Sequence, residues 1–597
     1  MDGSSSNDDN DGAIRVGISL DGADALTTLP IVSLTVRRAI NRIPWAEIVL
    51  TDGDMPSGSF ALSDEDDFAP GATVTITAGW GDNTATLFSG IVVRHGVKID
   101  NGNNSRLVIE CRDQATKMTI GRNNANYLQL KDSDIMSTLI GNHGLSADVK
   151  STTVQYDELV QFYCSDWDFM LARADASGLL VNVAAGKVSV QPPSTSGSAV
   201  LSVSWGRDLL SFEADIDARS QFTAVQATSW DPKAQAIAQG DRAEPATLNQ
   251  QGDLDGKTLA EVASPATYVL QTGASQPVAT LTAWAQAAQQ KAALARIRGR
   301  MRIMGTATAV PDSLIDVQGV GARFSGSVYV SSVEHLLTDG NWTTEVEFGL
   351  RPEWHVERED VMAPVNGGLL PGVCGLQIGV VLKLDGDPEG EQRIQVKLPV
   401  LQAQTEGVWA RLLQFHASNA FGAFFLPEVG DEVLLGYLND DPSHPVVLGS
   451  LYSSARKPPY TIEAANNTKA IVTRCLHKIE FNEEDKIITV ITPGNNQMVL
   501  DDKNQSITLL DQHNNSVKLS SAGIALDSKS DIKLTAQGSV TITANASISA
   551  TAQADVKVAG LNINCEAQVG FVGKGSATAE LSAAGQTTVK GAMVMIN

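Results

Sequence analysis

An eight-residue repeat near the C-terminus is the feature that most constrains how this chain can fold. Apolar residues recur at this interval from Ile524 to Val556, and each has a companion two residues later. Side chains alternate faces along a strand, so positions i and i+2 share a face, and an even period preserves that phase. The pattern predicts stacked short strands with one apolar face. Their predicted core consists of Ile524, Leu526, Ile532, Leu534, Val540, Ile542, Ile548, Val556 and Val558.

Such a stack needs identical partners. From Asn482 to Asn597 the only aromatic residue is Phe571, so a single chain has little with which to cover the apolar face. Burying one Ile, Val or Leu side chain contributes roughly 1.5–3 kcal/mol before chain entropy is subtracted. Only an assembly can collect this gain, so we expect an obligate homo-oligomer. The period alone does not fix the number of copies at three.

Other interpretations of the segment were weighed against the repeat. A stretch rich in Ala, Ser, Thr and Gly can be disordered, but disorder does not hold an eight-residue phase over five repeats. An antiparallel meander and a single-chain β-helix stay open. The phase slips between Leu519 and Ile524 and again at Ile563. We expect bulges or a change of winding at those two places.

Composition limits the remaining possibilities. A chain of 597 residues should hold several domains, and a formal net charge of −24 argues against nucleic acid as a partner. The sequence contains no run of 18 or more apolar residues, which is the length that a membrane-spanning helix needs. Residues 1–12 are polar and acidic, which predicts a disordered tail rather than a secretory signal. Five scattered cysteines without a CxxC pair are expected to be reduced, structural residues of a protein folded in the cytoplasm.

The order of the patterns divides the chain into regions. Residues 13–365 alternate strand-like runs with turns and carry three helical patterns, so we predict an α+β region with two β-rich units. The helices are expected near Asp132–Asn142, from the N-cap Ser165 to before Gly178, and over Val278–Arg298. Residues 366–460 hold five short strands, which suits a small barrel. The repetitive segment occupies residues 461–597.

Three sets of motifs resemble those of one known family. The barrel region contains Trp409-Ala-Arg411, Phe424-Phe-Leu-Pro-Glu-Val-Gly-Asp-Glu-Val433 and Asp440-Asp-Pro442, followed by His444-Pro-Val-Val-Leu-Gly-Ser-Leu-Tyr452. Earlier come Asp166-Trp-Asp-Phe-Met170 and Val317-x-Gly-Val-Gly321, and the last residues are Val589–Asn597. These motifs resemble the trimeric spike proteins of contractile injection systems. That family includes VgrG of type VI secretion, the spikes of extracellular phage-tail-like particles and the hub and spike of contractile phage tails.

The resemblance implies a mainly β fold with an α+β hub. Two tube-like β-barrels with helical insertions would form the hub domain, an OB-fold barrel would follow, and the end would be an intertwined triple-stranded β-helix. It also implies a homotrimer that joins a hexameric inner tube protein and baseplate proteins to a needle, which meets the target cell envelope transiently. The tip residues Met593, Val594, Met595, Ile596 and Asn597 would dock a PAAR-type (proline-alanine-alanine-arginine repeat) tip protein. The particle would be released extracellularly or fired across an envelope.

No residue pattern indicates catalysis, a cofactor or a metal. The eight histidines form no HxH, HxxxH or HExxH spacing, and His335 and His444 are expected to be structural. The regular repeat begins near Lys469, about ten residues after Pro459, which leaves no room for an inserted lysozyme, and we expect no toxin domain after the repeat. We predict a structural, non-enzymatic protein. The alternative is a trimeric β-helical tail protein that degrades or binds surface polysaccharide.

Overall fold

The computed structural model describes residues 12–23, 28–101, 104–246, 248–401 and 407–596. The chain forms two compact units, residues 1–451 and 452–597, which are described separately. Apart from Gly12, the predicted acidic tail lies outside the described residues. Within the described ranges, no helix is both long and apolar enough to cross a membrane.

Most strands of residues 13–365 form one twelve-stranded sheet. Its strands are β1 (Ile14–Leu20), β2 (Ile31–Ala39), β3 (Trp45–Thr51), β4 (Thr73–Trp80), β5 (Asn83–Asp100), β6 (Asn104–Arg112), β12 (Leu201–Ser204), β13 (Leu209–Ile216), β17 (Ile297–Met304), β18 (Leu314–Gln318), β19 (Gly326–Thr338) and β20 (Asn341–Phe348). The order is β1-β4-β5-β6-β3-β2-β19-β20-β17-β13, with β18 beside β19 and β12 beside β18.

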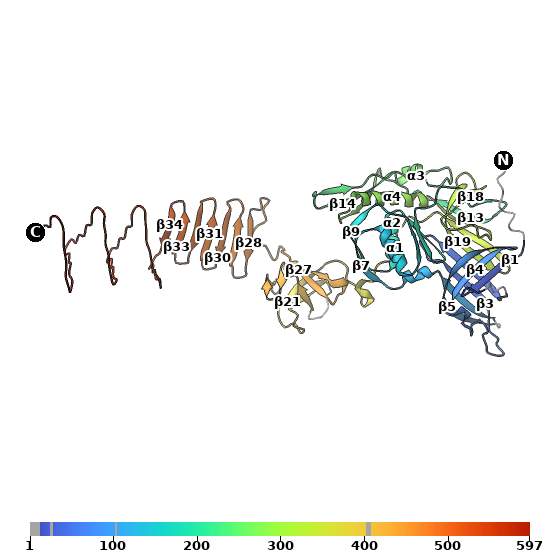
Figure 1. The fold of residues 1–597 in the computed structure, drawn as a ribbon, viewed down its shortest axis with the longest axis horizontal. Helices are drawn as coiled ribbons and strands as arrows, with labels where there is room; N and C mark the ends of the chain where they lie inside the picture. Colours follow the sequence, from blue (N-terminus) through green and yellow to red (C-terminus); the bar gives the residue numbers. More distant parts are fainter. Residues whose placement is uncertain (1–11, 24–27, 102–103, 247, 402–406, 597) are drawn as a thin grey trace. The chain divides into compact units, whose positions relative to one another are not determined.

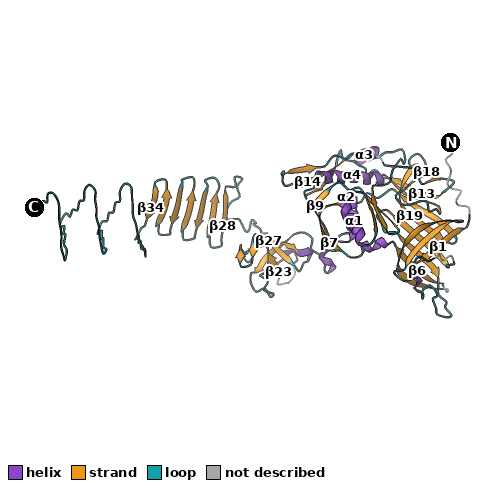
Figure 2. Cartoon of the chain, in the orientation of Figure 1, coloured by secondary structure: helices purple, strands orange, loops and turns teal. Residues whose placement is uncertain are grey.

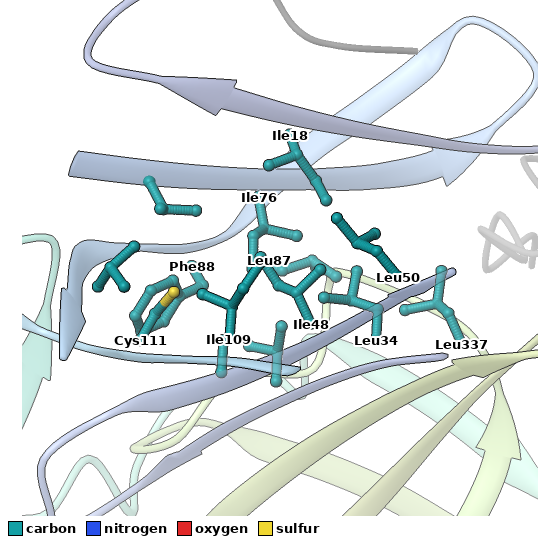
Figure 3. Close-up of a cluster of buried hydrophobic side chains, with 14 of the residues drawn as sticks. Ile18, Leu34, Ile48, Leu50, Ile76, Leu87, Phe88, Ile109, Cys111 and Leu337 are labelled. Atoms are coloured by element: carbon teal, nitrogen blue, oxygen red, sulfur yellow. The ribbon is translucent and has the colours of Figure 1, made fainter. Parts of the chain in front are cut away.

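Alternate residues of this sheet fill two separate hydrophobic cores. The first contains Ile18, Ile48, Ile76 and Ile109, which are fully buried and converge from different strands (Figure 3). The second gathers residues of β17 to β20 such as Val346. The two predicted β-rich units are therefore present as two cores. Their strands nevertheless form one continuous sheet, because β2 pairs with β19.

Helices and small sheets complete this region (Figure 2). The helices are α1 (Asp132–Asn142), α2 (Asp166–Ala176), α3 (Gly256–Ala263) and α4 (Val278–Ala295). Short 3-10 helices span Asp66–Phe68, Gln114–Thr119, His355–Glu357 and Val365–Gly368. Three small sheets are formed by β7 (Asn123–Lys131) with β9 (Gln155–Cys164), by β8 (Ser146–Val149), β10 (Leu180–Ala184) and β11 (Lys187–Gln191), and by β14 (Val225–Asp231), β15 (Ala236–Gln239) and β16 (Tyr268–Thr272).

The predicted helices are present, with one wrong boundary. The backbone N–H of Asp168 donates to Ser165 Oγ at 3.1 Å, which confirms Ser165 as the N-cap of α2. The prediction that the alanine-rich helix extends to Arg298 is wrong, since α4 ends at Ala295 and β17 begins at Ile297. Pairing of β17 with β13 and β20 withdraws these residues from the helix. Helix α3 is eight residues long and was not predicted.

The predicted small barrel is closed. Its strands are β21 (Gln377–Lys383), β22 (Ile394–Lys397), β23 (Val408–Leu412), β26 (Glu432–Tyr437) and β27 (Pro445–Ser450), in the order β21-β22-β23-β27-β26. A hairpin of β24 (Ala417–Ser418) and β25 (Phe421–Gly422) and two 3-10 turns, Pro399–Leu401 and Leu438–Asp440, complete it. The barrel motif forms the turn before β26. There Glu428 N donates to Asp431 Oδ2 at 2.8 Å, and Gly430 adopts a φ of +85° that favours glycine.

The second unit begins as an antiparallel meander (Figure 1). Its strands are β28 (Thr468–Val472), β29 (Lys478–Asn482), β30 (Ile487–Ile491), β31 (Gln497–Asp501), β32 (Ser506–Leu510), β33 (Ser516–Ser520) and β34 (Gly523–Asp527). The meander left open for this segment therefore applies to residues 468–527. A two-residue turn between β33 and β34 accounts for the first phase slip.

Residues 528–596 contain no strand but keep the eight-residue period. The backbone bends sharply at 529–530, 537–538, 545–546, 553–554, 561, 568–569, 576–577, 584–585 and 592. Successive bends are eight residues apart except for one interval of seven after residue 561. That interval coincides with the predicted slip at Ile563. The eight-residue period is confirmed in the backbone, and it continues beyond the five predicted repeats.

A buried ion pair ties α2 to the first turn of α1. Arg173 Nε donates to Asp132 Oδ1 at 2.7 Å, and Arg173 Nη2 donates to Asp132 Oδ2 at 3.1 Å. Tyr156 and Ser177 donate hydroxyl hydrogen bonds to the same carboxylate. Asp132 is 1% exposed, so loss of its charge would leave the guanidinium buried without a counter-charge.

We expect Asp132→Asn to lower the free energy of unfolding of residues 13–365 by about 3–5 kcal/mol, because breaking a buried pair strands the remaining charge. Urea unfolding followed by tryptophan fluorescence measures the loss. The matched control is Asp82→Asn, whose partner Arg15 and whose own carboxylate are both largely exposed. This exposed pair should contribute less than about 1 kcal/mol. Equal losses for the two variants would contradict the assignment.

Candidate functional site

One face of the β28–β34 meander carries two unbroken rows of side chains that face solvent. Residues directly opposite one another across neighbouring strands form each row. The first row is Ile471, Ile479, Val490, Met498, Leu509, Val517 and Leu526. The second is Lys469, Phe481, Ile488, Leu500, Ile507, Leu519 and Ile524. All but Lys469 are apolar, so the sheet presents a hydrophobic stripe along its length.

Among the residues that the structure describes, most of the stripe stays open to solvent, and Ile532 lies near its last strands. Ile479 is 38% exposed and Leu509 is 45% exposed, although both lie within the sheet rather than at its end. At the last strand, Ile524 rises to 73%. Large apolar faces of this kind mark sites of association, because leaving them in water is unfavourable.

The predicted core residues of the eight-residue repeat are exposed in the single chain. Ile532, Leu534, Val540, Ile542, Ile548, Val556 and Val558 are each 57–73% exposed. The tip residues Met593 and Ile596 are 80% and 91% exposed, whereas Asn597 lies outside the described residues. The structure thus presents these side chains as surface within one chain.

The meander also contains a 19-residue period that the sequence prediction missed. Five-residue turns begin at Thr473, Thr492 and Asp511, and each is closed by a backbone hydrogen bond from its first residue to its last. Four-residue turns alternate with them. Residues with positive φ recur at Leu476, Asn495 and Asn514. The period could have been found in the sequence from the 19-residue spacing of Asn495 and Asn514 and of the residues that open the turns, Thr473, Thr492 and Asp511.

Polar clusters of the first unit are tied into structural contacts. His355 Nε2 lies 2.9 Å from Asp168 Oδ1, and His143 Nε2 lies 2.8 Å from Asp166 Oδ2. Burial raises the pKa of Asp168, but hydrogen bonds from His355 and Ser165 outweigh it, so the pKa is lowered overall. In the part of the chain that the structure describes, no three His, Cys, Asp or Glu side chains are grouped as metal ligands.

The cysteines differ in their surroundings. Cys111 is fully buried in the first core, and burial raises the pKa of its thiol to about 12, which keeps it protonated. Cys374, Cys475 and Cys565 are exposed. The prediction that the cysteines are structural therefore fits Cys111, whereas burial within one chain does not test it for the three exposed thiols.

His335 has the structural role that was expected. It is 4% exposed, and its Nδ1 lies 3.0 Å from the hydroxyl of Thr344. Burial lowers the pKa of His335 to about 3, with a smaller contribution from nearby Arg38. The imidazole is therefore neutral in the folded protein. His444 instead lies exposed in a turn, 2.9 Å from Asp441.

Two family models match the chain. One, described as the Alg8 N-terminal domain, covers residues 10–339, which is more than half of the sequence. The other, described as the type VI secretion system/phage-baseplate injector OB domain, covers residues 377–452. The second match falls on the closed barrel and confirms the resemblance stated from its motifs.

Curated relatives are similar over shorter stretches. The actin cross-linking toxin VgrG1 of Vibrio cholerae serotype O1 is 30% identical over 125 residues, which is 19% of this chain and 11% of that protein. The type VI secretion system spike protein VgrG1c of Pseudomonas aeruginosa is 26% identical over 171 residues, which is 26% of this chain and 23% of that protein. The chain therefore spans only a small part of the length of these relatives.

A solved structure shares a more distant likeness. The 43 kDa tail protein of prophage MuSo2 from Shewanella oneidensis is 11% identical, with a TM-score of 0.43. It covers 57% of this chain and 99% of its own length.

We expect the stability of residues 13–365 to fall in acid through His335. The unfolded imidazole takes up a proton near pH 6.5, whereas the folded one stays neutral to about pH 3. Protons therefore favour unfolding, and the stability is lost as the pH falls through this window. The contribution amounts to about 2 kcal/mol between about pH 7 and about pH 5.

Urea unfolding at several pH values measures this dependence in wild type and in His335→Leu. The variant should lose that part of the slope, and Thr344 keeps its hydrogen bonds with Thr306. The exposed His416 supplies the control, since His416→Gln should leave the slope unchanged. Parallel curves for wild type and His335→Leu would rule out the assignment.

Proposed function

Since the chain belongs to the family defined by the Alg8 N-terminal domain, and since it also contains an injector OB domain, we propose that it is the structural spike and hub of a contractile injection machine. Residues 13–365 form the hub, residues 366–460 the OB domain and residues 461–597 the spike. Three copies join a hexameric inner tube and baseplate to a needle that punctures a membrane. The VgrG names of its relatives support this assignment.

The observation that carries the proposal is the uncovered apolar surface of the second unit. The stripe on β28–β34 leads directly into the repeat at Ile524 and Leu526. Both need cover from outside the chain, and a partner with the same period can supply it in register over the whole length. Three identical chains around one axis bury every copy equally, as a closed symmetric assembly requires. We therefore assign this unit to an intertwined triple β-helix.

Mechanical use explains the chemistry of the second unit. A needle that transmits force must resist bending, and the backbone hydrogen bonds that join β28 to β34 strand by strand leave that part few soft motions. Met593, Val594, Met595 and Ile596 place apolar side chains at its end, which suits docking of a PAAR-type tip protein. The only aromatic residue after Phe481 is Phe571, so no row of aromatic side chains exists to bind polysaccharide.

The remaining parts of the proposal concern chemistry and location. The histidine–carboxylate pairs of the hub join separate segments of the chain, which supports a structural role without catalysis or cofactor. The protein folds in the cytoplasm and is assembled into a particle that is released or fired across an envelope. Its contact with the envelope is transient, because the apolar residues of the needle face its own axis and are not available to bind lipid.

Light scattering of the full chain tests the oligomer. We expect a mass of three times the 63.2 kDa chain for wild type and a lower average mass for Ile507→Asp, because three carboxylates would be forced onto one apolar axis. The matched control is the neighbouring Thr508→Asp, whose side chain lies on the opposite face of β32 and should leave the trimer intact. A monomeric wild type would refute the proposal.

Co-purification tests the tip. We expect Met593→Asp/Met595→Asp to weaken binding of a co-expressed PAAR protein at least about tenfold, which corresponds to about 1.4 kcal/mol of lost apolar contact. Lys590→Gln, a few residues before the tip, serves as the control and should bind normally. Unchanged binding of the double variant, with the trimer retained, would place the docking surface elsewhere.

A further inference from the structure

A large cavity in the hub is lined by more cationic than acidic side chains, although the whole chain has a net charge of −24. Its volume is about 1280 Å³. Its cationic residues are Arg37, Arg42, Arg112, Arg122, Lys291, Arg351 and Arg358. Its acidic residues are Asp168, Asp175, Glu347, Glu353 and Asp360. Concentration of arginine at one place in an acidic protein requires an explanation.

Most of the carboxylates in the cavity are already engaged. Arg37 Nη2 lies 3.0 Å from Glu347, and Arg358 Nη2 lies 2.9 Å from Asp360. Lys291 Nζ lies 3.0 Å from Asp175, and its cation sits 5.0 Å from the centre of the Trp354 ring. Asp168 is held by His355.

Two arginines of the cavity have no acidic partner within the described part of the chain. Among the residues that the structure describes, neither Arg42 nor Arg351 forms a salt bridge or a side-chain hydrogen bond, and both are exposed. Arg42 is only partly exposed to water inside the cavity, and this partial burial lowers its pKa; repulsion from Arg358, Arg37 and Arg351 lowers it further, while Asp360 acts in the opposite direction. The guanidinium groups of the cavity thus repel one another, and an anion placed between them would relieve this repulsion.

An excess of negative charge lies on the segment between β3 and β4. Asp64, Glu65, Asp66 and Asp67 are consecutive and exposed, and none forms a salt bridge among the described residues. The run is firmly held at both ends. Ser63 N donates to Asp52 Oδ2 at 2.8 Å, and Phe68 is 1% exposed within the first core. Asp64 Oδ2 accepts a hydrogen bond from Phe60 N at 3.2 Å, so within the described ranges the run offers three carboxylates without such a bond and one with it, on a loop that does not line the cavity.

We infer that the arginine cavity of one copy receives the acidic run Asp64–Asp67 of a second copy. This inference rests on the proposed trimer, which brings identical hubs together. A short carboxylate run of this chain fits better than nucleic acid, because a chain with a net charge of −24 would repel a long polyanion. Arginine forks bind carboxylates in paired hydrogen bonds.

The contact explains how three hubs could close on one another. Cavity and acidic run are different surfaces of one chain, so each copy would offer its run to the next copy and receive one in turn. Such a head-to-tail contact closes into a ring when the rotation fits. Together with the contacts of the needle, this second set of contacts would fix how neighbouring hubs are oriented relative to one another.

Zero-length crosslinking of the full chain tests the contact. Arg351→Lys places an amine in the cavity, and a carbodiimide should join it to Asp64–Asp67 of another copy. We expect covalent species of two and three chains on a denaturing gel, with the joined peptides identified by mass spectrometry. Arg42→Lys is the second variant, should the first fail to fold.

The matched control carries Asp64→Asn, Glu65→Gln, Asp66→Asn and Asp67→Asn in the Arg351→Lys background, and this species should lose the crosslink. Persistence of the same crosslinked peptides, or a trimer by light scattering without any crosslink, would overturn this contact alone. A rise in thermal stability with added inorganic phosphate, without a crosslink, would make the cavity a small-anion site and also overturn it. A monomer in every sample would overturn the trimer as well.

Discussion

The apolar side chains of residues 468–596 form no buried core within their own chain. How these side chains are covered decides what the second unit can be. In the first unit, each hydrophobic cluster is enclosed by its own strands and helices, and residues such as Ile48 and Ile109 are fully buried. In the second unit, equally apolar residues such as Ile488 and Leu534 are 37% and 73% exposed, although they follow a strict period. In the proposed trimer, contacts with other chains would turn that regularity into stability.

The charged residues on and around α2 of the first unit hold separate segments of the chain together. On α2, Asp166 and Asp168 contact His143 and His355, and Arg173 contacts Asp132. The motif before β26 closes a turn through Asp431 and Gly430. Such residue types are also those that catalyse reactions, so their spacing in the sequence cannot distinguish the two roles. Here each charged group faces a structural partner, and this arrangement favours a rigid frame over a reactive centre.

The accuracy of the sequence prediction followed the range of the interactions involved. The eight-residue repeat and the N-cap Ser165 are local, so both could be predicted, and the backbone bends even reproduce the slip at Ile563. Pairing of β2 with β19 joins residues about 300 positions apart, so the continuity of the large sheet left no local signal. The end of α4 was missed because strand pairing, not a stop residue, ends it. The arginine cavity combines segments from many parts of the chain, and no spacing within the sequence brings them together.

The difference between the two units also suggests in which sequence folding and assembly take place. The first unit has buried cores of its own, so its folding does not require other copies. In the proposed trimer, the second unit would gain most of its stability from association, so its ordering would depend on chain concentration. Contacts between hubs would hold three second units close together and raise their effective concentration, as tethering does in other multivalent systems. A charged contact such as that between Arg351 and the run Asp64–Asp67 acts over a longer range than apolar packing does. It can therefore orient the hubs first, and the needle can then close from a register that the hubs have already set.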